Sequence, residues 1–325
     1  MGRNLWAAEV FNCQFPDTGN METLHLFGNP TQNAQWLEPL KNGEIRSAFV
    51  MTEPGVASSD AVQIKTQIKR EGDTYRINGQ KWWISGAGDP RCKVFLVLGD
   101  TTMNSPNGGK DLARHNRHSV VIVPRHTKGI VIKTPMTAFN YDDAPYGHFE
   151  VDFNDVIVPA SNLLYKEGTG FEIAQARLGP GRLHHCMRTV GLAERTLELT
   201  VQRLKSRSVQ GGTLLANLGA LRAELAESRI QVDSARLLVL RAASKIDEAG
   251  AKEARTLISI AKVQVPNAAL AVMDKAMQVH GGVGLSHQFP LAAWYSRTRT
   301  VRFMDGPDAT HLEVIAKTEI GRAKL

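Results

Sequence analysis

Two short runs in the first third of the sequence carry residues whose types and spacing could hold a ligand. The run Phe49-Val50-Met51-Thr52-Glu53-Pro54-Gly55 places a Glu-Pro-Gly turn after an apolar stretch, and the hydroxyls of Ser58 and Ser59 follow it. A turn of this kind leaves backbone N–H groups and hydroxyls free to meet an anionic group. Taken alone the run is only suggestive, because most Pro-Gly turns simply reverse the chain.

The second run combines paired tryptophans with a hydroxyl. Asn78-Gly79-Gln80-Lys81-Trp82-Trp83-Ile84-Ser85 brings both rings and the Ser85 hydroxyl near the end of an expected strand. Packing in a core or on a surface explains the tryptophans about as well as an aromatic wall beside a flat ring system does. Both interpretations stay open at this point.

The elements that must position these runs are predicted to be strands between about residues 49 and 160. Ten of the fourteen prolines precede residue 161, so long helices can lie only toward the end. Val62, Ile64, Thr66 and Ile68 alternate with polar residues, and Glu71-Gly72-Asp73 then predicts a hairpin. Further strands are expected at 94–98, 120–123, 130–132 and 149–158, and a surface loop at 101–118.

The hydrophobic period changes to that of helices after Asn162. Leu214, Leu218, Leu221 and Leu225 form one stripe, and similar stripes cover 171–204 and 253–279. Residues 308–322 read as a final helix. The first 48 residues look mostly helical. We therefore predict an α+β multi-domain chain with a partial N-terminal helical segment (1–48), a middle antiparallel β-barrel or sandwich (49–160) and a C-terminal four-helix-bundle-like domain (161–325).

Composition argues against several classes of protein. The formal charge is +7 and the pI about 9.4, yet no block of five or more like charges occurs, so we expect no nucleic-acid partner. The sequence contains no run of eighteen apolar residues, so we expect no membrane span. Three widely spaced cysteines indicate neither a disulfide framework nor a zinc site. We expect no metal, and we interpret His184, His185 and His311 as structural.

Taken together, the motifs resemble those of the acyl-CoA dehydrogenase family. In that family a T-E-P-G segment and an N-G-x-K-x-W-I-[ST] segment of the middle β-domain hold the flavin. The resemblance runs from about residue 5 to the end, and includes Gly179-Pro180-Gly181-Arg182, the run 278–284 and Asp305-Gly306. It is most similar to the group that contains acyl-CoA dehydrogenase family members 10 and 11. Several independent motifs in the same order make this resemblance specific.

The resemblance implies FAD as cofactor and assigns its contacts residue by residue. Met51 and Thr52 would contact the flavin ring, and Ser59 would contact the pyrophosphate. Trp83 and Ser85 would contact the face of the ring and its N5/O4 edge. Arg207 would reach the FAD of a neighbouring subunit. The adenosine half of that FAD would contact Gln278, Gly281 and Gly282. Gln210, Pro307 and Ala309 depart from the family pattern, which puts those cofactor contacts in doubt.

By the same resemblance Asp305 is the catalytic base, where most of the family has Glu. Removing an α-proton from a thioester needs a carboxylate that is basic once water is expelled. Without the resemblance, the alternative is that Asp305 only caps the helix that begins near Asp308. Some relatives carry their base just before the residue that matches Arg182, but that position is Gly181 here. Arg182 is expected to support the active site, against the alternative of a solvent-facing helix residue.

The implied activity is α,β-dehydrogenation of an acyl-CoA thioester to a trans-2-enoyl-CoA in fatty-acid β-oxidation. The implied partners are an electron-transferring flavoprotein as acceptor and a second or further copies of the chain, in a homodimer or homotetramer. An acyl-CoA oxidase that uses oxygen is one alternative. A shortened, non-catalytic product that binds FAD or assembles is another, because only 51 residues precede Thr52 where relatives carry several helices.

The C-terminal tripeptide bears on location. Ala323-Lys324-Leu325 is one substitution from the Ser-Lys-Leu peroxisomal address. We predict the cytoplasm or the peroxisome, with the mitochondrion as a third option.

Overall fold

The computed structural model describes residues 1–322, which form two compact units. One contains residues 12–178, and the other contains residues 1–11 together with the chain from 179 onward. This division differs from the expected domains 1–48, 49–160 and 161–325, whose boundaries stay a prediction. The tripeptide Ala323-Lys324-Leu325 lies outside the described residues, so the location also stays a prediction.

Short helices precede the sheet, as expected for the first 48 residues. They are α1 (Ala7–Val10), α2 (Asp17–Phe27), α3 (Pro30–Gln32) and α4 (Glu38–Lys41). The strands that follow are β1 (Arg46–Val50), β2 (Gln67–Glu71), β3 (Thr74–Ser85), β4 (Cys92–Asp100), β5 (His118–Pro124), β6 (Ile130–Met136) and β7 (His148–Pro159). The predicted strands at 94–98, 120–123, 130–132 and 149–158 are thereby confirmed.

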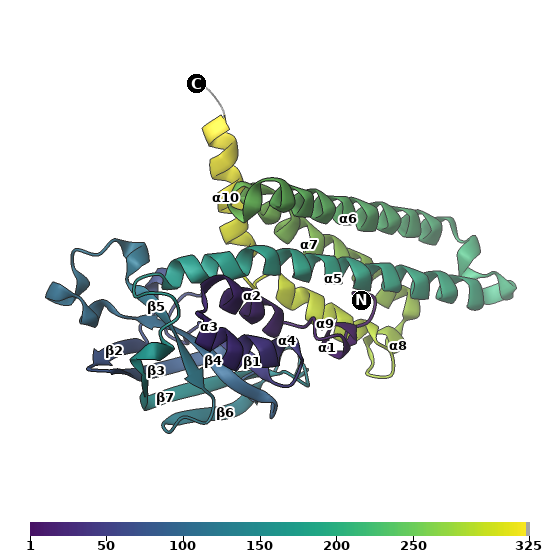
Figure 1. Ribbon diagram of the computed structural model, residues 1–325. Helices are drawn as coiled ribbons and strands as arrows, with labels where there is room; N and C mark the ends of the chain where they lie inside the picture. Colours follow the sequence, from purple (N-terminus) through teal and green to yellow (C-terminus); the bar gives the residue numbers. More distant parts are fainter. Residues whose placement is uncertain (323–325) are drawn as a thin grey trace. The chain divides into compact units, whose positions relative to one another are not determined.

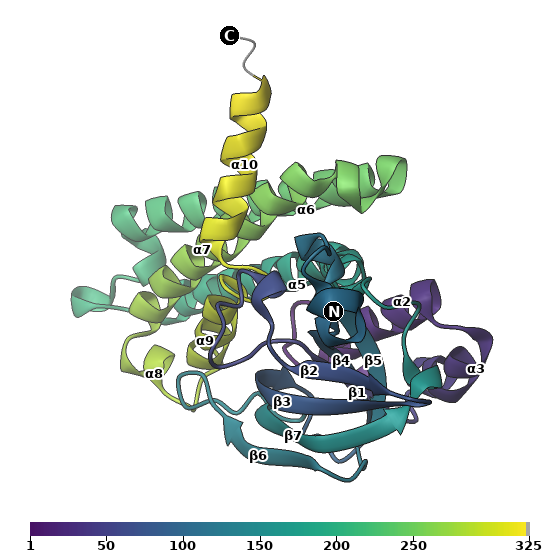
Figure 2. The same cartoon turned by 90° about the vertical axis from the view of Figure 1, so that its left-hand side faces the viewer.

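In the unit of residues 12–178 the strands make one curled sheet. Their order is β1-β4-β2-β3-β7-β6, with β5 paired to β4 (Figure 2). Most pairs are antiparallel, but β1 and β4 run parallel, which corrects the expectation of an entirely antiparallel domain. The chain leaves β1 through the Glu-Pro-Gly turn and not through a tight hairpin. The β2–β3 hairpin is inserted before β4, so β4 returns in the direction of β1.

The sheet is buried on both faces around β4. Phe95 and Val97 point into a cluster with Ile77, Val151 and Phe153 inside the curl. The alternate residues of β4 point to the other face, against the short helices α2–α4 shown in Figure 1; this second cluster contains Leu24, Leu37, Leu40, Val94, Leu96 and Leu98. The strand therefore reads as a nearly continuous apolar run, as strands covered on both sides do.

The expected hairpin begins later than the alternating pattern suggested. Ala61–Gln63 forms a short 3₁₀ turn, and β2 starts only at Gln67. The backbone N–H groups of Lys65 and Thr66 donate to the Glu53 carboxylate, both at 2.8 Å, and not to a neighbouring strand. The prediction of strand from Val62 was wrong because a side chain takes the hydrogen bonds that a ladder would need.

Helices make up the second unit apart from turns. They are α1, the later part of α5 (Gly170–Ser206), then α6 (Gly219–Glu253), α7 (Arg255–His280), α8 (Gly282–Leu285), α9 (Leu291–Val301) and α10 (Asp308–Arg322). This confirms the predicted helices at 171–204, 253–279 and 308–322. Leu214 and Leu218 precede α6, because Gly211 and Gly212, both with positive φ, close a turn in which Leu215 N–H donates to Arg207 O at 2.8 Å.

The three long helices share one apolar core. Leu183 and Val190 of α5 meet Val232 and Val239 of α6 and Val265 of α7. By length and composition α7 could cross a membrane, but 61% of its most apolar stretch is buried within the structure, as in the core helix of a soluble domain. A helical C-terminal part is confirmed, while its four-helix-bundle-like layout stays a prediction.

Candidate functional site

Asp305 lies in the loop between α9 and α10 with a backbone that L-residues rarely adopt. Its φ is +55°, that of Gly306 is +108°, and its side chain is 18% exposed. Aspartate tolerates the left-handed region better than most residues, and a residue held there at some cost is a reasonable mark of function. The loop therefore presents a carboxylate that water and ligands can reach.

Arg182 and Gly181 of α5 border this carboxylate. The Arg182 Nε–H donates to the backbone oxygen of Asp305 at 2.8 Å. A Cβ placed on Gly181 would lie 3.6 Å from Asp305 Oδ2, so the glycine leaves open the space beside the carboxylate. Burial lowers the pKa of Arg182, with Asp305 opposing the shift, but a guanidinium stays charged in proteins. The Gly-Pro-Gly-Arg run lies inside α5.

A buried lysine holds the loop in place through hydrogen bonds to its backbone. Lys262 is fully buried, and its Nζ donates to the carbonyl oxygens of Val301 and, at 3.2 Å, Gly306. Burial lowers the pKa of Lys262, because the charged form loses water. A further hydrogen bond joins the start of the loop to its end: Arg302 Nε donates to Asp308 Oδ2 at 2.7 Å. The backbone around Asp305 is therefore clamped on both sides.

Two of the histidines interpreted as structural lie in this neighbourhood. His185 Nε2 is 3.4 Å from Asp305 Oδ2, and burial lowers the pKa of His185 while Asp305 raises it. His311 is buried with Nδ1 3.1 Å from Ser259 Oγ, and burial lowers its pKa to about 4, with help from the positive charge of Arg182. His311 is therefore neutral at pH 7. Sequence reasoning missed the contact between His185 and Asp305, since no spacing signals it.

In the unit of residues 12–178, the two motif runs are tied to one another. Thr52 Oγ1 donates to Trp82 O at 2.6 Å, and Trp82 N–H donates to Thr52 O at 3.0 Å. Lys81 is fully buried and donates to Met51 O and Leu98 O, both at 2.7 Å, while its Nζ lies 3.0 Å from Glu53 Oε1. The Glu and Lys of the two motifs thus brace the backbone that carries Met51 and Thr52.

Trp83 and Ser85 extend from the same strand. Trp83 sits at a break in the β3–β7 register with φ +53°, and the residue is 40% exposed. A bulge of this kind re-aims a side chain, and a large aromatic residue adopts this backbone only rarely. The Ser85 Oγ is 2.9 Å from His148 Nδ1. Ser59 is exposed on the turn that follows Gly55.

The remaining predicted cofactor contacts lie at one end of the helical unit. Arg207 is exposed just after α5, and Gln278, Gly281 and Gly282 are exposed where α7 ends. Arg203 Nη2 donates to His280 O at 3.4 Å, which ties these two helix ends together. Gly281 has φ +67°, so the turn after α7 requires a residue without a side chain. The cofactor contacts of these residues stay predictions.

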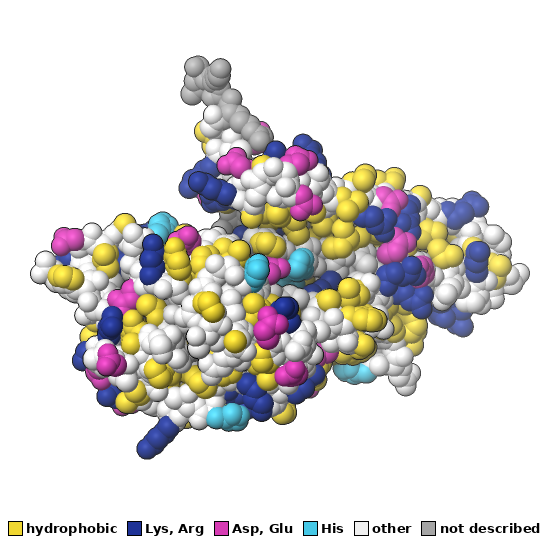
Figure 3. Space-filling view, viewed as in Figure 1, with side chains coloured by type: hydrophobic (Ala, Val, Ile, Leu, Met, Phe, Trp, Pro, Cys, Tyr) yellow, Lys and Arg dark blue, Asp and Glu magenta, His cyan; other side chains and the backbone are white. Residues whose placement is uncertain are grey.

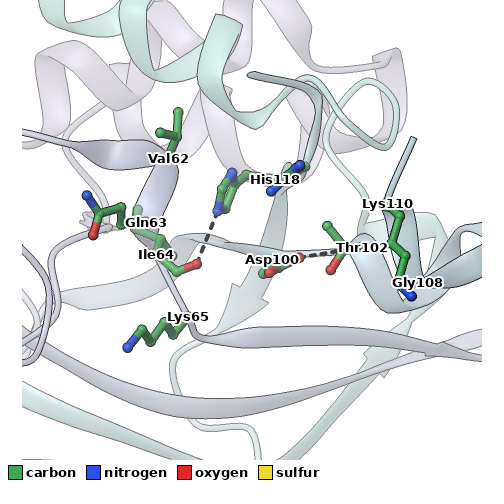
Figure 4. A pocket seen from close by; sticks show the side chains of 11 residues that line it. Val62, Gln63, Ile64, Lys65, Asp100, Thr102, Gly108, Lys110 and His118 are labelled. Atoms are coloured by element: carbon green, nitrogen blue, oxygen red, sulfur yellow. Dashed lines mark hydrogen bonds between the residues drawn. The ribbon is translucent and has the colours of Figure 1, made fainter. Parts of the chain in front are cut away.

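A separate pocket of about 390 Å³ lies between the turn at 62–65 and the 100–118 loop (Figure 4). His118 Nε2 points to Ile64 O at 3.1 Å, and Asp100 Oδ1 accepts from Thr102 N–H at 2.7 Å. The predicted site residues are absent from its described lining, which is Val62, Gln63, Ile64, Lys65, Asp100, Thr102, Gly108, Gly109, Lys110, Arg117 and His118. Within residues 1–322 no group of three or more His, Cys, Asp or Glu side chains could hold a metal ion.

Two family models match the chain: "Acyl-CoA dehydrogenase, middle domain" over residues 48–156 and "Acyl-CoA dehydrogenase, C-terminal domain" over residues 168–320. Probable acyl-CoA dehydrogenase FadE2 of Mycobacterium tuberculosis is 52% identical over 98% of this chain and 76% of its own length. Probable acyl-CoA dehydrogenase IBR3 of Arabidopsis thaliana is 51% identical over 99% of this chain. Acyl-CoA dehydrogenase family member 11 of Gallus gallus is 51% identical over 98% of it.

The chain spans only 38% of the length of the Arabidopsis relative and 40% of that of the Gallus relative. Family member 10 of Mus musculus is 48% identical over 98% of this chain and 29% of its own length. The expected similarity to members 10 and 11 is confirmed. A solved structure of a putative acyl-CoA dehydrogenase from Mycobacterium abscessus superposes with a TM-score of 0.93 at 47% identity, covering 99% of this chain and 77% of that one.

Proposed function

This chain belongs to the acyl-CoA dehydrogenase family, and on that premise we propose that it oxidises the Cα–Cβ bond of an acyl-CoA thioester to a trans-2-enoyl-CoA with FAD, in fatty-acid β-oxidation. The observation that carries the proposal is the Asp305 carboxylate. It is partly exposed on a clamped loop and has open space beside it at Gly181. Such a carboxylate is suited to proton abstraction.

The chain's own residues account for the acid–base part of the reaction. Asp305 accepts the α-proton of the thioester and becomes neutral. Arg182 and Lys262 hold the backbone carbonyls of Asp305 and Gly306, so the carboxylate stays placed when its charge is lost. The Asp305 N–H is proposed to donate to the thioester carbonyl, where negative charge develops.

The residues of the middle β-domain fit a flavin. Trp83 offers an exposed flat ring, Ser85 a hydroxyl, and the turn after Glu53 a set of unencumbered backbone groups around Gly55, where an added Cβ would meet nothing within 4 Å. The Thr52 hydroxyl donates its hydrogen to Trp82 O, so Thr52 Oγ1 can only accept a hydrogen bond from a ligand. When bound, FAD supplies the redox chemistry by taking the hydride from Cβ.

The proposed partners are further copies of this chain and an electron-transferring flavoprotein as acceptor. Figure 3 shows hydrophobic side chains gathered along α6, and Ile230, Leu237 and Leu240 are exposed there by 65%, 66% and 50%. An apolar groove of about 560 Å³ lies nearby, lined by α5 and α6 residues that include Leu197, Val201 and Leu225. Exposed apolar surface of this kind supports self-association as a homodimer or homotetramer.

The test is an anaerobic titration of the FAD-loaded protein with saturated acyl-CoAs of several chain lengths. The proposal predicts loss of the oxidised-flavin absorbance with at least one of them, and a thioester product that has lost two hydrogens. Bound flavin that no acyl-CoA bleaches would overturn the proposed activity. Rapid reoxidation by oxygen after bleaching would favour an oxidase.

A further inference from the structure

A chain of three hydrogen-bonding side chains lies beside Trp83. Ser85 Oγ is 2.9 Å from His148 Nδ1, and His148 Nε2 is 2.9 Å from Asp143 Oδ2. The side chains of His148 and Asp143 are only 9% and 11% exposed, so the link between them is shielded from water. We call Ser85, His148 and Asp143 the Ser85 relay.

The surrounding fold fixes the imidazole at the centre of the relay. His148 opens β7, and it is paired across the sheet with Ser85 at the end of β3 and with Met136 at the end of β6. The centroid of its ring lies 5.6 Å from that of Trp83 and 5.8 Å from that of Tyr146. Because residue 148 is paired to strands on both sides and its ring contacts two aromatic rings, each imidazole nitrogen keeps its own partner.

The relay determines which way the Ser85 hydroxyl points. An ionised carboxylate only accepts hydrogen bonds, so Asp143 requires the hydrogen of His148 to be on Nε2. In the neutral imidazole Nδ1 is then an acceptor, and the Ser85 hydroxyl must be the donor. With its hydrogen used in this way, Ser85 can only accept a hydrogen bond from any other group.

We propose that the Ser85 relay fixes Ser85 as a hydrogen-bond acceptor toward the N5–O4 edge of the flavin and thereby favours the reduced cofactor. This inference rests on the proposed function, in which Ser85 meets that edge. The N5 atom of the oxidised ring accepts a hydrogen bond, whereas in the reduced ring it carries a hydrogen and donates one. Hydrogen bonds to the ring nitrogens tune a flavin's electronics. His148 and Asp143 are therefore positioning residues that act through Ser85.

Asp143→Asn tests the inference because it reverses the polarity of the relay. An asparagine tolerates the φ of +52° at this position, and its amide can donate to His148 Nε2. The imidazole hydrogen would move to Nδ1 and point at Ser85, which frees the Ser85 hydrogen to donate to the flavin. A wrong tautomer of this origin is the known result of the matching change in serine proteases.

The sign of the effect separates the relay from simple charge removal. Loss of a nearby negative charge should favour the reduced flavin. Reversal of the relay should favour the oxidised flavin. The matched control is Asp142→Asn, which removes the same charge one residue earlier. The Asp142 carboxylate is exposed and accepts a hydrogen bond from Ala144 N–H.

The measurements are the flavin midpoint potential by anaerobic spectroelectrochemistry and the His148 tautomer by ¹⁵N NMR. We expect Nε2–H in the wild type and Nδ1–H in Asp143→Asn. We also expect about a tenfold fall in the reduced-to-oxidised ratio at fixed potential in that variant, equivalent to about 30 mV for a two-electron couple. Asp142→Asn should leave the tautomer unchanged and should not lower the potential.

Three outcomes would overturn the inference. One is an Nδ1–H tautomer in the wild type, which can be read from the flavin-free protein and does not depend on activity. Another is a potential that rises in Asp143→Asn as far as in the control, and the third is an unchanged potential in Asp143→Asn. If the wild type bound no flavin at all, the proposed function would fail as well, whereas a normal flavin and acyl-CoA response with unchanged potential would sink the relay alone.

Discussion

The Nε2 atom of His185 lies 3.4 Å from the Oδ2 atom of Asp305, so a buried imidazole faces the carboxylate proposed as the base. Burial lowers the pKa of His185, and at neutral pH the ring is therefore an uncharged hydrogen-bonding partner. An N–H facing an ionised carboxylate stabilises the ionised form. The ring is placed to keep Asp305 deprotonated before substrate binds.

Replacing His185 with Phe should move the acidic limb of the pH profile upward. The phenyl ring keeps the volume but removes the nitrogen, so the carboxylate of Asp305 would protonate at higher pH. One lost hydrogen bond of about 1.4 kcal/mol corresponds to about one pH unit. The limb of single-turnover flavin reduction against pH measures this. His185→Gln, which keeps a donor, should stay near the wild type; a limb unchanged in both variants would contradict the role.

Lys81→Met should weaken both the fold and flavin binding. The change leaves Glu53 buried without its cation and Met51 O without its donor. Breaking a buried ion pair from one side costs about 3–5 kcal/mol. Urea unfolding and FAD titration measure the two effects. The double variant Lys81→Met/Glu53→Gln should recover part of the stability, because the lone buried charge is gone. If the double variant proved as unstable as the sum of the single variants, the pair would not act as a unit.

A third prediction concerns pH and Glu194 on α5. Hydrogen bonds from Arg229, at 2.6 Å, and from Arg236 lower the pKa of Glu194 to about 2. Because the folded pKa lies below the unfolded value of about 4.5, the stabilisation is present above pH 4.5 and is lost as pH falls toward 2. The two arginines are partly exposed, so we expect only about 1–2 kcal/mol at pH 7.

The measurement is urea unfolding of the wild type and Glu194→Gln between pH 7 and pH 3. The gap in stability should be widest at pH 7 and should narrow below pH 4.5. The matched control is Asp233→Asn, which removes a half-exposed carboxylate that contacts the same two arginines and should cost less than about 0.5 kcal/mol. A gap that widened in acid would refute the assignment.

A carboxylate moved to residue 181 should restore part of the lost activity. An added Cβ at Gly181 would lie 3.6 Å from Asp305 Oδ2, so Gly181→Glu would place its acid in the same neighbourhood. In an Asp305→Asn background we expect at least a tenfold recovery of single-turnover flavin reduction, a small part of what general-base catalysis contributes. Gly181→Gln in that background is the control and should recover nothing. Equal rates for the Glu and Gln variants would show that residue 181 is not in reach of the substrate.

The sequence predicted those elements whose signal is local. The apolar periodicity gave α5, α7 and α10, and the bounded runs gave β4 to β7. The sequence-based prediction failed where a distant side chain competes for backbone hydrogen bonds. Glu53 accepts hydrogen bonds from the N–H groups of Lys65 and Thr66, so β2 begins later than predicted. The parallel pairing of β1 with β4 is a property of long-range topology that no local pattern records.

The candidate site divides in the same way. Asp305, Arg182 and Trp83 were predicted because they sit in motifs, and the structure gives each a distinct local environment, although their roles stay predictions. The contact of His185 with Asp305 joins residues 120 positions apart, and Lys262 reaches the loop from another helix. The Ser85 relay likewise depends on register between β3 and β7. Such contacts exist only once the chain is folded.

The most direct test of the central claim is the anaerobic reaction of FAD-loaded wild type and Asp305→Asn with the same acyl-CoA. Asparagine keeps the shape of the side chain but cannot accept the α-proton. We predict that the variant binds FAD as the wild type does, yet reduces it about 10²–10⁴-fold more slowly. Flavin reduction in Asp305→Asn at a rate close to that of the wild type would contradict the assignment of Asp305 as the base.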